Sequence, residues 1–282
     1  MLKGFAAVLV CAAGLFWAGP ASCADITTWL CLYSTDFGPE EYGRFDLVVL
    51  DGVNHPSLEH RSPGQPVLLG YVSVGEERED GPVWDLVQDQ PFVAGRNDDW
   101  NSLVLDLRSP AWRGILLDRV IPEVLAQGFD GVFLDTMDSA LALAHGEDKA
   151  KYQGMREAAL SFLAEVRRRW PGIHIALNRG LELLPEAAPG LDSLLIEDLS
   201  FGYDFSEKAY RPVPSAVRDE LVAAAHAARA ANPKLTVLTL DYVEPGRKAN
   251  IREAIRYSRS QGFVPYVSTL KLDQVFYYTL GR

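Results

Sequence analysis

The sequence predicts an α/β protein whose residues 25–282 form a single (β/α)8 TIM barrel. The chain has 282 residues, and a barrel of this kind commonly takes about 250. Eight short, nearly continuous apolar runs are typical of parallel strands covered on both faces, and helical patterns lie between many of them. An open doubly wound sheet is the alternative fold, although no G-x-G-x-x-G motif follows the first run to indicate a dinucleotide site.

The eight predicted strands are rich in Val, Ile, Leu and aromatic residues, and most end in a polar residue. They are Trp29–Tyr33, Asp46–Asp51, Pro66–Ser73, Gly131–Asp135, Ile173–Asn178, Ser193–Glu197, Leu235–Asp241 and Phe263–Ser268. Apolar stripes at helical spacing predict helices over Ala111–Gln127, Ala158–Trp170, Arg218–Ala231 and Ala249–Gln261, the last ending at Gly262 as a C-cap. The longest stretch without a pattern, Asp80–Asn101, is predicted to be an irregular insertion over the barrel mouth.

Residues 1–24 have the features of a secretory signal peptide. Lys3 precedes an apolar stretch from Phe5 to Ala18, and small residues lie before a cleavage point at Asp25. An uncleaved anchor and a lipid on Cys23 are the alternatives. We expect an exported, monomeric mature protein, periplasmic or extracellular, without a membrane span. Cys31 is then its single cysteine, so no internal disulfide is expected.

The charge balance argues against a nucleic-acid partner. The chain has 27 Lys and Arg against 38 Asp and Glu, a formal net charge of -11, whereas nucleic-acid binding requires a basic face. The histidines show none of the spacings typical of zinc sites, and we expect no metal or cofactor. A magnesium or calcium site built from Asp51, Asp135 and Asp241 is the alternative.

Strand phase selects the polar residues that point into the barrel. Side chains alternate along a strand, so Asp135 and Glu197 are predicted to point inward at the ends of their strands. The same count places further residues there: Tyr33, Asp51, Tyr71, Ser73, Asn178, Asp241 and Ser268. By phase, Arg179 points away. Because barrel active sites are built at the carboxyl ends of the strands, these side chains predict a functional rim.

Paired inward carboxylates without a matching cation are typical of glycoside hydrolysis. One carboxyl must donate a proton to the leaving oxygen while the other stays charged, and crowding raises the pKa of one of them. Buried salt bridges or helix caps are the structural alternative, above all for Asp138. Several aromatic side chains are candidates to line a sugar cleft: Tyr33, Tyr71, Trp84, Trp100, Tyr203, Tyr242 and Tyr266.

Four segments together resemble one enzyme family. They are Gly70–Glu76, Val104–Trp112, Gly128–Ser139 and Ile196–Asp198. The chain resembles the endo-α-1,4-polygalactosaminidase family of glycoside hydrolases, whose fold also forms the hydrolase domain of the Pel exopolysaccharide-processing protein. The resemblance implies a barrel that cleaves α-1,4-linked galactosamine or N-acetylgalactosamine exopolysaccharide, as found in biofilms, with an acid after the fourth strand and a Glu after the sixth.

On this sequence, the implied catalytic residues are Glu197 as proton donor and Asp135 as nucleophile or base, with Asp138 as the other candidate for the leading acid. The predicted substrate-binding residues are Tyr33, Asp51, Tyr71, Ser73, Glu76, Asp138, Asn178, Tyr203, Asp241 and Tyr242. Carboxyls about 5 Å apart predict a retaining reaction and carboxyls about 8 Å apart an inverting one, and both stay open. A non-catalytic glycan-binding barrel for export or adhesion is the alternative function.

Overall fold

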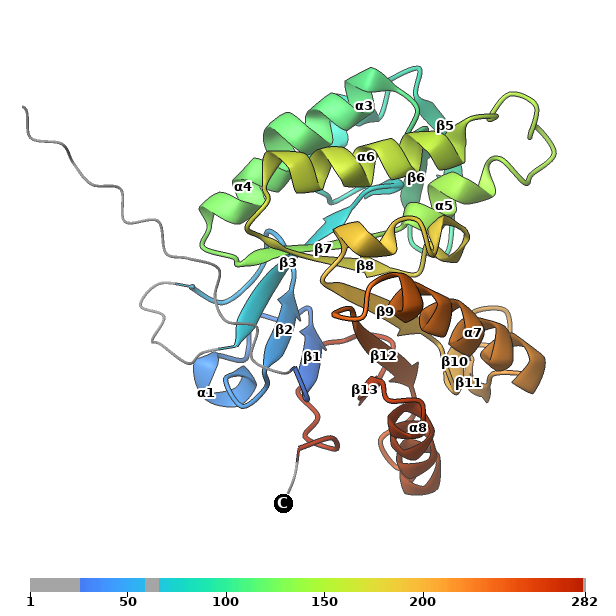
Figure 1. Cartoon of the computed structure of the whole chain (residues 1–282). Coiled ribbons are helices and arrows are strands. Elements are labelled where there is room, and N and C mark those ends of the chain that lie inside the picture. Colours follow the sequence, from blue (N-terminus) through green and yellow to red (C-terminus); the bar gives the residue numbers. More distant parts are fainter. Residues whose placement is uncertain (1–25, 59–65, 281–282) are drawn as a thin grey trace, which may run out of the picture.

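Eight parallel strands form one sheet in the order β1-β2-β3-β7-β8-β9-β12-β13, which confirms the predicted barrel (Figure 1). The structure is a computed structural model that describes residues 26–58 and 66–280. The strands are β1 Trp29–Leu32, β2 Leu47–Leu50, β3 Val67–Ser73, β7 Gly131–Asp135, β8 His174–Asn178, β9 Ser193–Glu197, β12 Thr236–Tyr242 and β13 Val264–Ser268. Each overlaps one predicted strand, with ends shifted by at most one residue.

The two edge strands, β1 and β13, meet through side chains and a following loop. The Trp29 indole donates a hydrogen bond to the carbonyl of Val264 at 3.0 Å, and its ring packs edge-on against Tyr266 with the centroids 5.7 Å apart. The backbone N–H of Tyr33 donates to the carbonyl of Leu272 at 2.7 Å. These contacts draw the sheet into a nearly closed ring.

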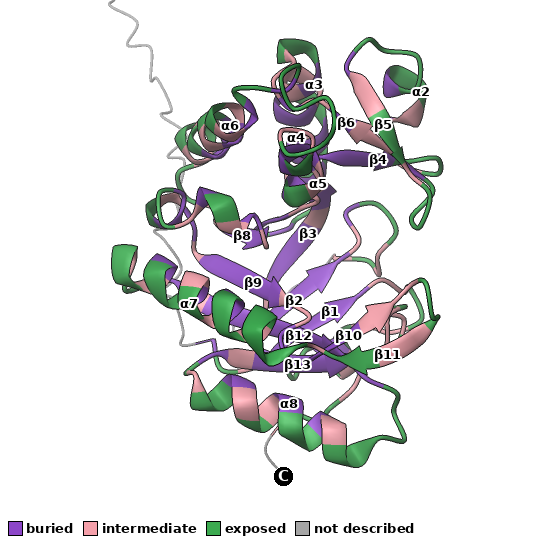
Figure 2. Cartoon of the chain, turned by 90° about the vertical axis from the view of Figure 1, so that its right-hand side faces the viewer, coloured by how far each residue is buried: buried purple, intermediate pink, exposed green. Residues whose placement is uncertain are grey.

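Helices cover the outside of the ring, with their apolar sides against the buried strands (Figure 2). They are α1 Pro39–Tyr42, α3 Pro110–Ile115, α4 Ile121–Ala126, α5 Met137–Ala142, α6 Met155–Arg169, α7 Ser215–Ala231 and α8 Lys248–Ser260, with 3-10 turns η2 Leu181–Leu183 and η3 Ala188–Gly190. A π-helical segment, η1 Leu116–Val120, joins α3 to α4 within the predicted Ala111–Gln127 helix. Pro122 lies two residues after this segment and lacks an N–H donor, which accounts for the irregular hydrogen bonding. Gly262 has the positive φ of 71° expected of a C-cap.

The insertion after β3 is more regular than predicted. Strands β4 Glu76–Arg78, β5 Val93–Asn97 and β6 Ser102–Leu105 form an antiparallel sheet in the order β4-β6-β5, with the short helix α2 Trp84–Val87 between β4 and β5. The prediction of an irregular stretch was wrong because β5 is polar and interrupted by Gly95, so it has no apolar run. The backbone N–H of Leu105 donates to the carbonyl of Gly75 at 2.8 Å and ties this sheet to the end of β3.

A second excursion, the antiparallel hairpin β10 Phe201–Asp204 and β11 Ala209–Pro212, follows β9. Phe205 in its turn packs edge-on against Trp100 from the β5–β6 turn, with ring centroids 5.4 Å apart. The β4-β6-β5 sheet and the β10–β11 hairpin therefore contact each other through Trp100 and Phe205.

The predicted signal peptide, residues 1–24, lies outside the described residues. Within the parts that are described, no helix combines the length and the apolar character needed to cross a membrane. Cys31 is buried in β1, and this burial raises the pKa of its thiol.

Candidate active site

Asp135 and Glu197 converge on a single amide at the carboxyl ends of three adjacent strands. Strand β8 lies between β7 and β9 and ends at Asn178. The Asn178 Nδ2 atom donates to Asp135 Oδ1 at 2.8 Å and to Glu197 Oε2 at 2.9 Å. The structure therefore brings the two predicted acids together, with the predicted Asn between them.

The shared amide sets the spacing of the two carboxylates. Oxygens at 2.8 Å and 2.9 Å from one nitrogen lie no farther apart than the two distances together, 5.7 Å. Since the two N–H bonds of an amide diverge by about 120°, the separation is about 5 Å. A carboxylate pair at this distance leaves no room for a water molecule between the base and the anomeric carbon.

Two phenols complete the hydrogen bonds of the pair. The Tyr242 hydroxyl donates to Glu197 Oε1, and the Tyr71 hydroxyl hydrogen-bonds the Asp135 carboxyl. Burial, followed by the negative charge of Glu197, raises the pKa of Asp135 to about 7. Asp135 therefore holds its proton more firmly beside Glu197 than it would alone.

The residue directly after each of the three central side chains has a left-handed backbone. The φ angles are 61° at Thr136, 54° at Arg179 and 57° at Asp198. Such values are rare for residues other than Gly, Asn and Asp. The chain thus leaves each strand abruptly, and from these positions onward strand phase no longer predicts where side chains point.

The left-handed turn at Arg179 changes the direction of its side chain. Strand phase predicted that this side chain points away from the rim. Instead its guanidinium lies 3.6 Å from the Asp138 carboxylate, so this cation pairs with the acid that follows β7 by three residues. The prediction for Arg179 was wrong. The signal that the sequence offers is the adjacent Gly180, which is also left-handed, with a φ of 62°.

Asp198 also has a left-handed backbone, and it was not predicted as a site residue. Burial, followed by the charge of Glu197, raises the pKa of Asp198 to about 8. Its Oδ1 atom is buried and has no hydrogen-bond partner among the described residues. A Cβ at position 202 would lie 2.8 Å from this carboxyl, so Gly202 is needed to make room for it.

Asp241 does not reach the pair, contrary to the expectation that it points inward. Its side chain is fully buried, and its Oδ1 accepts the backbone N–H groups of Ser200 at 2.5 Å and Phe201 at 2.8 Å. The strand ends at Tyr242 instead of Asp241, and Tyr242 is the residue that contacts Glu197. The assigned phase of this strand was wrong by one residue, which exchanges its two faces.

Two further predicted carboxylates accept hydrogen bonds from neighbouring protein groups. Asp51 Oδ1 accepts the backbone N–H groups of Val53 at 2.8 Å and Asn54 at 2.7 Å. Glu76 is buried in β4, where its oxygens accept the Asn97 amide at 3.0 Å and the Ser102 hydroxyl at 2.5 Å. Both residues shape the walls around the rim.

The remaining predicted residues fall into two groups. Tyr33 and Tyr71 pack edge-on with ring centroids 5.4 Å apart, next to Asp135. Tyr203 lies in the β10–β11 hairpin, where it packs against Phe205 at 5.2 Å and Tyr210 at 5.2 Å. Tyr33 and Tyr71 therefore lie beside the carboxylate pair. Tyr203 belongs to the hairpin whose Phe205 contacts Trp100.

The alternative metal site has no support in the geometry. Within residues 26–58 and 66–280, no group of three or more His, Cys, Asp or Glu side chains is arranged to hold a metal ion. Asp51 accepts backbone N–H groups of its own loop, and Asp241 accepts those of Ser200 and Phe201, so neither joins Asp135.

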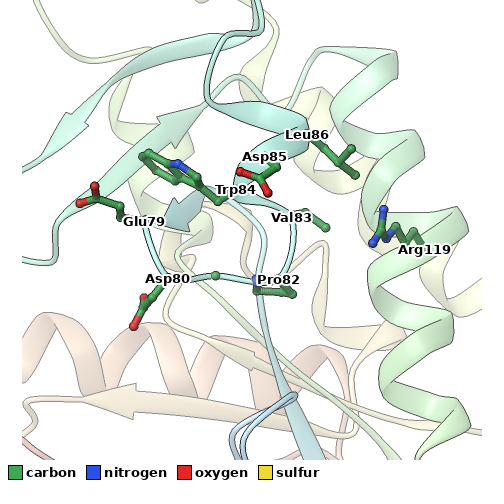
Figure 3. A pocket seen from close by; sticks show the side chains of 9 residues that line it. Glu79, Asp80, Pro82, Val83, Trp84, Asp85, Leu86 and Arg119 are labelled. Carbon is green, nitrogen blue, oxygen red and sulfur yellow. The ribbon is translucent and has the colours of Figure 1, made fainter.

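Two surface cavities lie on the insertion, away from the carboxylate pair. One of about 330 Å3 is lined by Glu79, Asp80, Gly81, Pro82, Val83, Trp84, Asp85, Leu86 and Arg119 (Figure 3). The other, of about 310 Å3, is lined by Arg78, Glu79, Asp80, Trp100 and Asn101. The predicted cleft aromatics Trp84 and Trp100 therefore face these cavities.

Comparisons with known proteins identify the family. The model of glycoside-hydrolase family GH114 matches residues 13–282. The glycoside hydrolase domain of PelA from Pseudomonas aeruginosa is 33% identical, with a TM-score of 0.75, over 89% of this chain and 97% of that one. An uncharacterised protein of Deinococcus radiodurans is 27% identical over 243 residues, which are 82% of this chain and 75% of that protein.

The fold is also shared more distantly. Ega3 of Aspergillus fumigatus, solved in complex with galactosamine, is 15% identical, with a TM-score of 0.68, over 92% of this chain and 98% of that one. The family match and the likeness to the PelA domain confirm the resemblance seen in the sequence. The chain belongs to glycoside-hydrolase family GH114.

Proposed function

We propose that this glycoside hydrolase cleaves α-1,4-linked galactosamine or N-acetylgalactosamine polymers with retention of anomeric configuration. The observation that carries the proposal is the Asn178 amide shared by Asp135 and Glu197, with donor–acceptor distances of 2.8 Å and 2.9 Å. A separation of about 5 Å is typical of a nucleophile and an acid/base on the same scissile bond. The complex of Ega3 with galactosamine supports the choice of substrate.

In the proposed reaction, Asp135 attacks the anomeric carbon while Glu197 gives its proton to the departing glycosidic oxygen. The C–O bond to the leaving sugar breaks as the bond to the Asp135 oxygen forms, which gives a covalent glycosyl-enzyme. Glu197, now ionised, takes a proton from water, and the resulting attack releases the sugar and restores Asp135. The cycle needs Asp135 ionised and Glu197 protonated at the start. Burial and the charge of Glu197 raise the pKa of Asp135 to about 7, and the proton on Glu197 removes the second of these causes.

The geometry favours Asp135 over Asp138 as the leading acid. Asp135 shares Asn178 with Glu197, whereas the side chain of Asp138 is half exposed and pairs with Arg179. We therefore place Asp138 at the edge of the site, where it orients Arg179 toward bound sugar.

The test is the release of reducing ends from partially deacetylated α-1,4-galactosaminan. Asp135→Asn and Glu197→Gln should each lower kcat by about 10²–10⁴-fold, with a melting temperature at or above that of wild type. Glu123→Gln is the matched control, because it removes an exposed carboxylate paired with Arg119 and should leave kcat unchanged. Wild-type activity in either site variant would refute the assignment, and glycan binding without hydrolysis by wild type would support the binding-protein alternative.

Activity on an activated substrate distinguishes the proton donor Glu197 from the nucleophile Asp135. An aryl glycoside with a good leaving group needs little protonation, so Glu197→Ala should still release a rapid burst of the aryl alcohol. Its steady-state rate should stay low, because Glu197 is also the base of the second step. Asp135→Ala should lose activity on every substrate, because the nucleophile is gone. The opposite pattern would exchange the two roles.

We further propose that the protein acts outside the cytoplasm, on exopolysaccharide. The support is the signal-like segment at residues 1–24. N-terminal sequencing of the protein recovered from the periplasm or medium should begin at Asp25, and a full-length N-terminus would contradict export by cleavage.

A further inference from the structure

Thr136 follows Asp135 directly and has an unusual backbone. Its φ of 61° and ψ of 15° place it in the left-handed region. For a β-branched residue this conformation is a genuine outlier, because the branched Cβ crowds the backbone. Such a conformation persists only where the surroundings determine it, and it is often found where a reactive side chain must be aimed.

The surroundings of the Thr136 hydroxyl account for its conformation. Oγ1 lies 2.7 Å from the carbonyl oxygen of Asp135 and 2.7 Å from Ser73 Oγ, and it accepts the backbone N–H of Gly75 at 2.9 Å. The Ser73 hydroxyl in turn donates to the carbonyl of Glu76 at 2.7 Å. One hydroxyl thus joins the end of β7 to the β3–β4 corner.

The backbones at this corner are in close contact. The N–H of Val74 donates to the carbonyl of Asp135 at 2.9 Å. A Cβ on residue 75 would lie 2.0 Å from the carbonyl oxygen of Thr136, so only glycine fits there. The carbonyl of Asp135 is therefore held both by Val74 and by the Thr136 hydroxyl, and the Thr136 N–H bonds the Asp135 carboxylate.

We propose that Thr136 is a positioning residue for Asp135, whose hydroxyl holds the left-handed turn that aims the Asp135 carboxylate at Asn178 and at the anomeric carbon. This inference rests on the proposed role of Asp135. It also revises the predicted role of Ser73, which joins this clamp instead of reaching toward substrate. A nucleophile must be held to within about 0.5 Å, and a Thr hydroxyl with three neighbours provides that restraint.

Thr136→Val tests the proposal because valine keeps the shape and removes the hydroxyl. We expect kcat per folded molecule to fall about 10- to 100-fold, with KM changed less than about threefold, since the loss is in alignment and not in sugar contacts. Thr136→Ser keeps the hydroxyl and should retain kcat within about threefold. Wild-type kcat in Thr136→Val, or equal loss in Thr136→Ser, would overturn the proposal.

Thr239→Val is the matched control for stability. The Thr239 hydroxyl is buried and lies 2.7 Å from Ser258 Oγ, against helix α8 and away from the carboxylate pair. Its replacement should lower the melting temperature without lowering kcat. If Thr136→Val does not fold, Thr136→Ala removes the same hydroxyl with less crowding. A lower kcat in Thr136→Ala would then support the proposal, and a wild-type kcat would overturn it.

A second readout does not depend on hydrolysis. Carbon-13 NMR titration of the Asp135 carboxyl reports its surroundings in every variant, with Glu197, Asp138 and Tyr71 left in place as the groups that face it. Loss of the turn removes the Thr136 N–H from the carboxylate, so the titration midpoint should rise by half a unit or more in Thr136→Val and stay in place in Thr136→Ser. An unchanged midpoint in Thr136→Val contradicts positioning, even if the polymer proves not to be the substrate.

Discussion

The Tyr242 hydroxyl donates a hydrogen bond to Glu197 Oε1 across the neighbouring strands β12 and β9. The phenol is buried, and burial together with the Glu197 charge raises its pKa well above the usual value. It therefore stays protonated and remains a hydrogen-bond donor to Glu197. Together with the Asn178 amide, which donates to Glu197 Oε2, the phenol fixes the orientation of this carboxyl.

Tyr242→Phe should lower kcat about 3- to 30-fold. The variant removes a hydrogen bond to a charged group, which contributes about 1.5–3 kcal/mol, and leaves the Glu197 carboxyl held by the Asn178 amide without the phenol. Tyr266→Phe is the matched control, because its hydroxyl lies 3.4 Å from the carbonyl of Gln274 and away from the acids. An unchanged kcat in Tyr242→Phe would show that the contact is only structural.

The reaction should proceed with net retention. Asp135 and Glu197 bind one nitrogen at 2.8 Å and 2.9 Å, which is too close to admit the attacking water of an inverting enzyme. Proton NMR of the first product formed from an α-linked oligomer should show the α-anomer before mutarotation. An initial β-anomer would require the carboxyls to lie farther apart than they do in this structure.

Stability should fall as pH rises through the neutral range. Burial raises the pKa of five carboxyls: that of Asp138, and those of Asp135 and Glu77 to about 7, Asp198 to about 8 and Asp241 to about 6. Between about pH 4 and pH 8 the unfolded chain has already lost these protons while the folded chain keeps them, so ionisation favours unfolding as pH rises. The melting temperature should be higher near pH 5 than near pH 8.

Asp135→Asn provides the internal check on this linkage. It removes one raised carboxyl, so its melting temperature should exceed that of wild type by more at pH 8 than at pH 5. A wild-type melting temperature that increases from pH 5 to pH 8 would contradict the raised pKa values of these buried acids.

Asp241 should contribute to stability and not to substrate affinity. Asp241→Ala leaves the N–H groups of Ser200 and Phe201 without their acceptor, which costs about 1–3 kcal/mol for each unsatisfied group. Asp241→Asn keeps an acceptor oxygen and should lose less. Urea unfolding measures the loss, and KM of the folded protein should not change; a raised KM at full stability would restore the substrate-binding role predicted from the sequence.

The sequence by itself determined the barrel and the two acids. Buried parallel strands must be continuously apolar, and the chain shows these runs with polar ends, so the strands and the positions of Asp135, Asn178 and Glu197 could be predicted. Strand alternation sufficed for these three because each lies within a strand, where the period of two holds.

Only the tertiary structure decided what happens just beyond the strands. The left-handed turns at Thr136, Arg179 and Asp198 depend on contacts between distant segments, such as the Thr136 hydroxyl with Gly75, which no local pattern encodes. A one-residue shift at the end of β12 likewise exchanged Asp241 for Tyr242. Side-chain direction in a strand depends on register, which is set by pairing with neighbours, and the final shape of the site therefore came from packing across the rim.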